Sequence, residues 1–164
     1  MIELNSKTQQ DFLNREWVQK LLEVGVDMSD AKYALQELDG KDHIIYVGNY
    51  KETPYMMVDI VPTYTVSELL YKLHEYIYPV INGKEFSGGL TMLKDAPFYM
   101  FYYKLKSKEY DNNKPYDEQP SEWNEDYLYA EFEYPIESLA SLLIQCHQKD
   151  IGMKMKDTGN ISDK

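Results

Sequence analysis

The clearest structural signal in the sequence is Thr65-Val66-Ser67-Glu68-Leu69-Leu70, which predicts the start of a helix. Thr65 is a favourable N-cap, and Glu68 lies three residues later, where its side chain can accept from the backbone N–H of the cap; together they form a capping box. The apolar residues continue at helical spacing as far as Ile77, and Pro79 then ends the helix.

Two further stretches have apolar residues at helical spacing. The first runs from Arg15 to Val24, and Gly25 follows it as a natural left-handed C-terminal residue. The last starts at Pro135, in the first turn where proline is tolerated, and Gly152 is expected to end it. The side chains predicted to face inward from this last helix are Ile136, Leu139, Ala140, Leu143 and Cys146.

Two apolar runs on either side of Asp39-Gly40 predict a β-hairpin formed by Lys32–Leu38 and His43–Gly48. A short helix over Ser29–Leu38 is the competing interpretation. Phe98–Leu105 is apolar or aromatic at both its odd-numbered and its even-numbered positions, which point to opposite faces of a strand. This pattern predicts a central strand covered on both faces.

The remaining strands complete an α+β pattern. Gly88-Gly89 predicts a loop that leads into a strand over Leu90–Leu93, and Tyr127–Tyr134 alternates as a strand with one buried face. The element order predicts an antiparallel sheet of about four to five strands with helices packed on it. We expect a single domain over residues 1–152 and a flexible polar tail over 153–164.

Composition excludes several classes of protein. The net charge of −11 argues against direct nucleic-acid binding, and Arg15 is the only arginine available to grip phosphate. No apolar run approaches the roughly 18 residues of a membrane helix, and the N-terminus lacks the order of a secretory signal. Because Cys146 is the only cysteine, no internal disulfide forms, and we expect a cytoplasmic location.

Residues 107–126 form a long acidic loop, in which seven acids and two lysines give a net charge of −5. The chain also contains 16 tyrosines, more than one core can bury, and tyrosine is favoured at recognition surfaces. These two features predict a surface that binds a protein partner, possessing aromatic contact area among acids that select a basic partner. The residues of this predicted surface are Tyr110, Tyr116, Asp117, Glu118, Glu122, Trp123, Glu125, Asp126, Tyr127 and Tyr129.

No motif predicts catalysis, a cofactor or a metal site. The three histidines do not have metal-binding spacing, and His74 is expected on a solvated helix surface. Cys146 and His147 are adjacent on a helix and so point about 100° apart, which excludes a thiolate–imidazolium pair. Phosphate-loop, dinucleotide and serine-nucleophile motifs are absent. We therefore expect a protein that is not an enzyme.

The order of elements between Pro62 and Gly152 resembles a known group of proteins. Pro62–Leu70 opens a helix, Gly89–Leu105 gives a strand pair, Tyr127–Tyr134 is a strand and Pro135–Ile144 closes with a helix. This layout resembles small uncharacterised proteins of bacteriophages and gut-bacterial prophages, some grouped as phage α-β-α sandwich domains. The resemblance covers a little over half of the chain and rests on element order and the capping pattern. It implies a phage or mobile-element accessory protein in a bacterial cell, with no functional residues to transfer.

The function expected from these features is a non-enzymatic protein–protein interaction module. The alternative is a counter-defence inhibitor, which is either an acidic DNA mimic that blocks a host nuclease or an oligomer that sequesters a nucleotide. Mimicry requires carboxylates in ordered rows, because duplex DNA carries a charge about every 1.7 Å along its axis. The acids available for it are Glu109, Asp111, Asp117, Glu118, Glu122, Glu125 and Asp126. The oligomeric state is open, and the surplus tyrosines are compatible with a homodimer.

Overall fold

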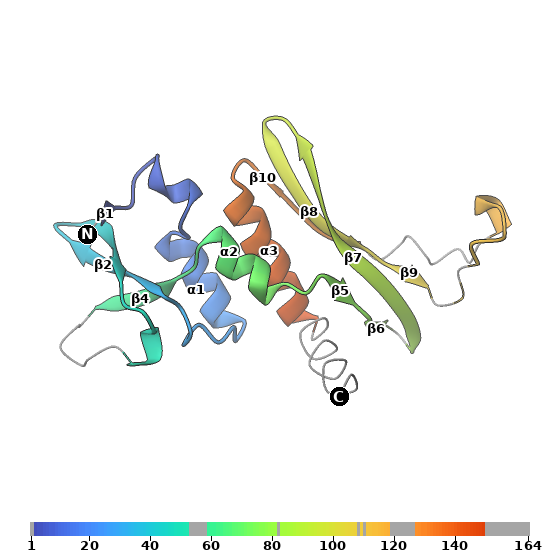
Figure 1. Ribbon diagram of the computed structural model, residues 1–164, viewed down its shortest axis with the longest axis horizontal. Coiled ribbons are helices and arrows are strands. Elements are labelled where there is room, and N and C mark those ends of the chain that lie inside the picture. The colour runs from blue at the N-terminus through green and yellow to red at the C-terminus, as the bar shows by residue number, and fades with distance from the viewer. Residues whose placement is uncertain are drawn as a thin grey trace.

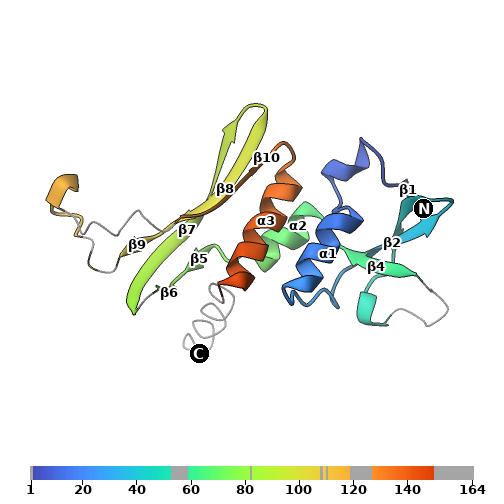
Figure 2. The same cartoon turned by 180° about the vertical axis from the view of Figure 1, so that it is seen from behind.

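Two antiparallel β-sheets stand on either side of three helices, so the molecule is layered as sheet, helices, sheet along its long axis (Figure 1). Figure 2 shows the same layers from behind. The structure is a computed structural model and describes residues 2–52, 59–81, 83–107, 109, 111–118 and 127–149. This arrangement confirms the predicted α+β class, with helices packed on antiparallel strands.

The first sheet has four strands in the order β1-β3-β2-β4. Their bounds are β1 Ile2–Glu3, β2 Tyr33–Leu38, β3 Lys41–Tyr46 and β4 Ile60–Thr63. β2 and β3 form the predicted hairpin, and Leu38 pairs with Lys41, so the loop contains only Asp39 and Gly40. Both loop residues have positive φ, 54° and 75°, as a type I′ turn requires. The competing helix is excluded, because β2 is paired on both sides.

The first two helices begin at caps that the sequence supplies. α1 (Arg15–Glu23) starts after Asn14, whose Oδ1 accepts from the backbone N–H of Trp17 at 3.0 Å. The chain leaves α1 through Gly25 at a φ of 88°, which confirms the predicted left-handed residue. α2 (Val66–Lys72) has the predicted capping box, with both of its reciprocal hydrogen bonds present. Local sequence therefore sets where both helices begin.

α2 ends at Lys72, short of its predicted end, because the chain that follows is held in extended form. β5 (Tyr76–Ile77) pairs with β7 (Lys84–Asp95), and the hydroxyl of Tyr103 donates to the carbonyl of His74. His74 is buried, so its prediction as a surface histidine is wrong. Sheet pairing here outweighs the helical spacing of the apolar residues.

The second sheet has six strands, with β10-β8-β7-β5 in order and with β6 and β9 also paired to β7. The bounds not yet given are β6 Val80–Ile81, β8 Phe98–Lys104, β9 Lys106–Ser107 and β10 Tyr127–Phe132. The predicted loop at Gly88-Gly89 is wrong, since both glycines lie inside β7. A Cβ on Gly88 would lie 2.9 Å from Leu105 Cδ2 and 3.0 Å from the Lys104 carbonyl oxygen, so close packing of the chain requires glycine there.

α3 (Pro135–Gln148) lies between the second sheet and the other two helices (Figures 1 and 2). Its five predicted inward side chains are all buried. Ser138 is buried too: its Oγ accepts from the Phe132 backbone N–H at 3.0 Å and donates to the Tyr99 carbonyl at 2.7 Å. This hydroxyl thus joins α3 to the last residue pair between β10 and β8. The predicted helix end at Gly152 lies outside the described residues.

Two expectations about the strands need correction. The strands form two sheets rather than one, because the helices pack between them. β8 is central, as predicted, but only one of its faces is covered by described residues: Phe101 and Tyr103 are buried, whereas Phe98 is exposed.

The tail over 153–164 lies outside the described residues. Within the described part of the chain, no helix has the length and apolar character needed to cross a bilayer.

Candidate functional site

The structure places the described members of the predicted partner surface in two separate regions. Tyr116, Asp117 and Glu118 form the short 3-10 helix η3 (Tyr116–Glu118), while Tyr127 and Tyr129 lie on β10. Figure 1 shows η3 beyond the end of the six-stranded sheet, away from the middle of β10. The other predicted residues, Tyr110, Glu122, Trp123, Glu125 and Asp126, lie outside the described residues.

Three of the described acids around η3 are exposed to solvent, and local turns hold the segment that contains them. Glu109, Asp117 and Glu118 are exposed. The backbone N–H of Glu118 donates to the Pro115 carbonyl at 3.0 Å, and Asp111 accepts from the Asn113 backbone N–H at 2.9 Å. This segment lies at the end of the molecule farthest from the four-stranded sheet (Figure 1). Its negative charge is therefore presented away from the body of the protein.

The six-stranded sheet has an outer face, turned away from α3, that described residues leave open. In an antiparallel sheet, paired residues share a face. Pairing across β10, β8 and β7 places Tyr129, Tyr102 and Thr91 in one row, Glu131, Met100 and Leu93 in the next, and Phe98 with Asp95 in the last. The exposed fraction is 54% for Tyr129, 49% for Leu93 and 42% for Phe98. We call these eight residues the open face.

A tyrosine pair extends the open face towards β5. A Cβ on Gly89 would lie 3.3 Å from the ring of Tyr76, so this ring covers the glycine from the outer side of the sheet. Tyr76 in turn stacks on Tyr78, with ring centroids 6.4 Å apart, and both side chains are more than half exposed. Aromatic contact area is thus present on the sheet as well as in the predicted acidic loop.

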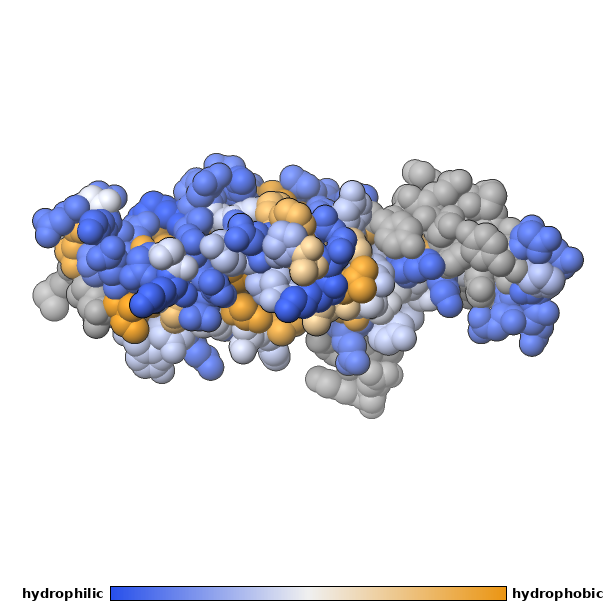
Figure 3. All heavy atoms as spheres, turned by 90° about the horizontal axis from the view of Figure 1, so that it is seen from above, coloured by the Kyte–Doolittle hydropathy of each residue, from blue (hydrophilic) through white to orange (hydrophobic). Residues whose placement is uncertain are grey.

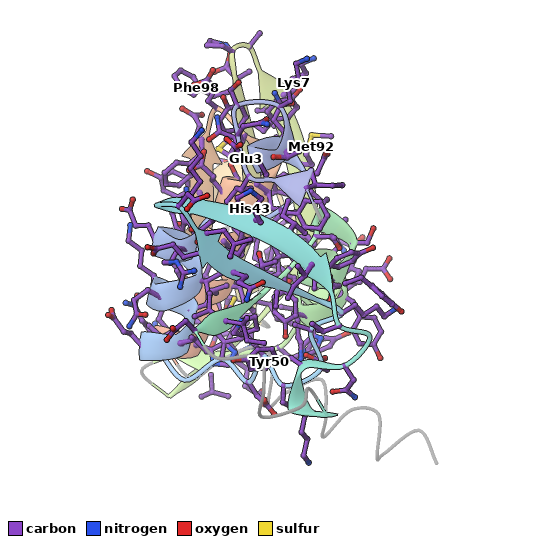
Figure 4. The ribbon with its side chains drawn as sticks, turned by 90° about the vertical axis from the view of Figure 1, so that its left-hand side faces the viewer. Glu3, Lys7, His43, Tyr50, Met92 and Phe98 are labelled. Atoms are coloured by element: carbon purple, nitrogen blue, oxygen red, sulfur yellow. The ribbon has the colours of Figure 1, made fainter. Side chains whose placement is uncertain are left out.

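The end of the β7–β8 hairpin projects past the helices, and all of residues 91–98 are exposed (Figure 1). Figure 4 shows Met92 and Phe98 near this end of the hairpin. Met92 is 55% exposed and lies on the opposite face of β7 from Leu93, its neighbour in sequence. Seen from above, apolar patches lie over this part of the molecule among hydrophilic surroundings (Figure 3).

The free edge of the sheet at β10 is partly covered by α3. Gln145 donates from Nε2 to the backbone carbonyl of Tyr129 at 2.7 Å. An edge strand presents unpaired backbone groups that can pair with another chain, and a side chain bound to such a group hinders that pairing. The face of this sheet is therefore more accessible to a partner than this edge.

A cavity beside α2 has a volume of about 420 Å³. Its lining residues are Asp30, Lys32, Tyr64, Ser67, Glu68, Tyr71 and Lys72. The polar groups here bind one another: the Tyr64 hydroxyl donates to Asp30 Oδ1 at 2.6 Å, and Lys72 Nζ lies 2.9 Å from Asp30 Oδ2. Glu68 accepts from the backbone N–H of Lys32 at 3.2 Å and also completes the capping box.

Protonation states in this cavity follow from the same contacts. Burial, and then the hydrogen bond to Asp30, raise the pKa of Tyr64 well above its usual range. Burial opposes ionisation of Asp30, but the Tyr64 hydroxyl and the Lys72 ammonium outweigh it, so the pKa of Asp30 is lowered. The result is a neutral phenol beside an ion pair. This network joins α2 to the segment before β2 and has the character of a structural contact.

The residues that could support chemistry are not arranged for it. Cys146 is buried in α3, and burial raises the pKa of its thiol to about 12, so it is not a thiolate near neutral pH. Among the described residues, no cluster of three or more histidine, cysteine or acidic side chains could hold a metal ion.

Arg15, the only arginine, has a structural partner. Its guanidinium contacts Asp42 on β3 through Nε at 3.1 Å and Nη2 at 2.6 Å, and the hydrogen bond raises the pKa of Arg15. This pair ties α1 to the four-stranded sheet. The sequence shows that the arginine is alone, but nothing in it identifies Asp42 as the partner.

The open face itself was missed at the level of sequence. Phe98–Leu105 has apolar residues on both parities, and this was interpreted as burial on both sides. The same pattern also fits a strand that has one buried face and one apolar contact face.

Comparison with protein-family models, with curated proteins and with solved structures finds no match to this chain.

Proposed function

We propose that this protein is a non-enzymatic interaction module in which the acidic segment over residues 107–126 binds a basic protein partner. Following the resemblance in the order of elements, we place it among the accessory proteins of phages or other mobile elements, acting in the bacterial cytoplasm. Asp117, Glu118 and the acids beside them supply attraction at long range, and tyrosines supply contact area at short range.

The observation that carries this proposal is the uneven distribution of charge. The six-stranded sheet contains four lysines and three acids, a net charge of +1: Lys84, Lys94, Lys104 and Lys106 with Glu85, Asp95 and Glu131. The chain has 17 basic and 28 acidic residues, so 13 and 25 lie elsewhere, a net charge of −12. Nearly half of that excess is in residues 107–126, next to a sheet that is close to neutral. A projecting acidic segment beside a neutral sheet favours a basic partner at this end of the molecule.

DNA mimicry by the same acids has weaker support. The described acids in this segment lie in turns and in a three-residue helix, and Lys114 is among them. These described acids do not form the regular carboxylate rows that match a phosphate backbone. Nucleotide capture is also less favoured, since the cavity beside α2 contains two acids whose polar atoms are already bound within the protein.

The test is capture of partners from a bacterial extract by the tagged full chain, at low and high salt, with mass spectrometry. The informative variant is Asp111→Asn/Asp117→Asn/Glu118→Gln. The matched control, Glu16→Gln/Glu23→Gln/Glu75→Gln, removes the same charge from exposed positions on α1 and after α2. We expect a basic protein that is captured at low salt and released at high salt, because screening weakens exposed charge pairs.

The two variants show whether the captured partner binds to the acidic segment or to negative charge elsewhere on the protein. The proposal predicts that the first variant loses most of the captured protein and that the control retains it. Equal loss from both variants contradicts a specific acidic segment and attributes capture to net charge. If the captured protein is a nuclease whose DNA cleavage is blocked, the result favours the mimic instead.

A further inference from the structure

We infer that the open face of the six-stranded sheet is the contact surface between two copies of this chain, packed face to face as a homodimer. This inference does not depend on the acidic segment and goes beyond the proposed function. It rests on three observations: the apolar character of the face, its charge, and the order of its rows.

The apolar character of the open face is unusual for a surface exposed to water. Leu93, Phe98, Met100, Tyr102 and Tyr129 all lie on it, and three of them are more than 40% exposed. The inner face of the same strands is packed against α3, with Leu128, Phe101 and Tyr103 buried. Two apolar faces on one sheet are typical of a sheet that is covered on both sides. In this chain, the described residues cover only one.

The charge of the sheet identifies the kind of partner. A chain of net charge −11 repels its own copies over most of its surface, whereas the outward side of this sheet carries only −1. Its charged residues are Glu85, Asp95 and Glu131 with Lys104 and Lys106. A basic partner is drawn to the acidic regions and gains little here. A two-fold contact needs a surface that complements itself, and a nearly neutral face with both signs of charge meets that condition. The open face contains Asp95 and Glu131, and Lys104 lies in the adjoining row.

The outward rows of side chains along the sheet complement those of a second copy when the two copies are related by one particular two-fold axis. Along β8, the outward residues are Phe98, Met100, Tyr102 and Lys104. A two-fold axis that crosses the strands midway along this series places the first residue over the fourth and the second over the third. The Lys104 row then lies over the Asp95–Phe98 row of the other copy, which pairs a cation with a carboxylate and an aromatic ring. On β10, the same axis places Glu131 over the hydroxyl of the other copy's Tyr129.

Packing through the face fits better than pairing through the edge. Strand addition at β10 requires its outward backbone groups, and Gln145 occupies the carbonyl of Tyr129. Stacked sheets, in contrast, leave this hydrogen bond intact and bury side chains at a spacing of about 10 Å.

The experiment is sedimentation equilibrium of the full chain over a range of protein concentrations, at low and moderate salt. The expected species has twice the 19.4 kDa mass of one chain. Because screening reduces repulsion between acidic copies, salt should tighten the dimer. Salt has the opposite effect on capture of a basic partner, so failure of this inference can be distinguished from failure of the proposed function.

Neighbouring residues on opposite faces of β7 provide the matched variants. Leu93→Lys is expected to raise the dissociation constant of the dimer at least about tenfold, which corresponds to about 1.4 kcal/mol. Met92→Lys adds the same charge to the other face, at similar exposure, and should leave dimerisation unchanged. Tyr129→Ser provides a second test on β10 and should also weaken the dimer. All three changes are at exposed positions, and an unchanged melting temperature at low concentration confirms folding.

A chain that stays monomeric at concentrations of hundreds of micromolar overturns the inference, as does equal loss of dimer in the Leu93 and Met92 variants. A dimer that survives both Leu93→Lys and Tyr129→Ser also overturns it, since the contact is then elsewhere. Binding of a different protein to the open face of a monomeric chain overturns the choice of occupant.

Discussion

The two sheets of this protein differ in how their faces are covered. In the four-stranded sheet, consecutive residues are buried: Ala34 and Leu35 on β2, and Ile44 and Ile45 on β3. Because consecutive residues point to opposite faces, this sheet is covered on both sides. In the six-stranded sheet, the buried residues of β8 are alternate ones, and the intervening residues are half-buried or exposed.

The four-stranded sheet therefore contributes both of its faces to the folded core, whereas the six-stranded sheet also presents an exposed face. The four-stranded sheet is further fixed by the pair of Arg15 and Asp42 and by the ring contact of Phe12 with Tyr33, whose centroids are 5.0 Å apart. Among the described residues, helices pack on only one side of the six-stranded sheet, where α3 contacts β8 and β10. A strand sequence with apolar residues on both parities can therefore belong to either kind of sheet.

The largest expected effect is on the free energy of unfolding. It compares a buried leucine in the four-stranded sheet with an exposed leucine in the six-stranded sheet. Leu35→Ala should lower the free energy of unfolding by about 2–5 kcal/mol, because Leu35 is fully buried and the change leaves a cavity. Leu93→Ala, at an exposed position, should cost less than about 1 kcal/mol. Urea unfolding at low micromolar protein concentration measures both. Similar losses from the two variants contradict the difference in coverage.

A smaller effect is expected from the hydroxyl that joins α3 to the six-stranded sheet. Ser138→Ala should cost about 1–3 kcal/mol, since it removes the partner of the Phe132 N–H and the Tyr99 carbonyl. Ser141→Ala, on the same helix but only partly buried, should cost less than about 0.5 kcal/mol. Thermal unfolding of the two variants gives the comparison, and equal melting temperatures argue against the bridging role.

Much of this fold could be predicted from local sequence, because caps, turns and helical spacing are local. The capping box at Thr65, the left-handed Gly25 and the Asp39-Gly40 turn are all present as predicted. The end of α2 was missed, since pairing of β5 with a distant strand decides it. The division into two sheets was missed for the same reason: strand partners are set by packing between remote segments.

The site was less predictable than the fold. Sequence composition identified an excess of tyrosine and an acidic segment, and the structure places Asp117, Glu118 and Tyr129 at exposed positions. It does not bring η3 and β10 together into one surface (Figure 1). The open face depends on which residues α3 leaves uncovered, and this cannot be read from the spacing of residues along β8.

The ion pair of the four-stranded sheet should contribute modestly. Asp42→Asn removes the charge that Arg15 contacts, and we expect a loss of at most about 1 kcal/mol, because the pair is partly exposed and screened. Glu3→Gln, which alters a longer and more exposed contact with Lys41 at 3.7 Å, should have no measurable effect. Thermal unfolding at two salt concentrations tests this: a loss for Asp42→Asn that does not shrink with salt contradicts a screened pair.

The smallest effect concerns pH. The pKa of Asp30 is lowered in the folded protein, so its ionised form adds stability above its unfolded pKa of about 3.9, and this stability is lost as the pH falls through the lower folded pKa. Asp30→Asn should therefore be less stable than the wild type by a few tenths of a kcal/mol at pH 7, and the gap should narrow as the pH falls below about 4. Unfolding curves at pH 7 and pH 3 measure it. A gap that widens on acidification contradicts the role of the Lys72 and Tyr64 contacts.

Salt provides an independent check on self-association. Two chains of net charge −11 with centres about 30 Å apart repel by roughly 6 kcal/mol at 0.01 M salt and by less than about 1 kcal/mol at 0.15 M. The dimer should therefore be much weaker at the lower salt concentration.

The most direct test of the open face is chemical crosslinking between copies of the full chain. Thr91→Cys places a thiol on the open face near the inferred axis, and Met92→Cys places one on the opposite face of β7. The native Cys146 is buried and does not compete for the reagent. A short bis-maleimide, which spans the roughly 10 Å between stacked sheets, should link two copies of Thr91→Cys and leave Met92→Cys monomeric. Equal crosslinking of the two variants, or none of either under conditions where the chain is dimeric, would contradict the assignment of this face.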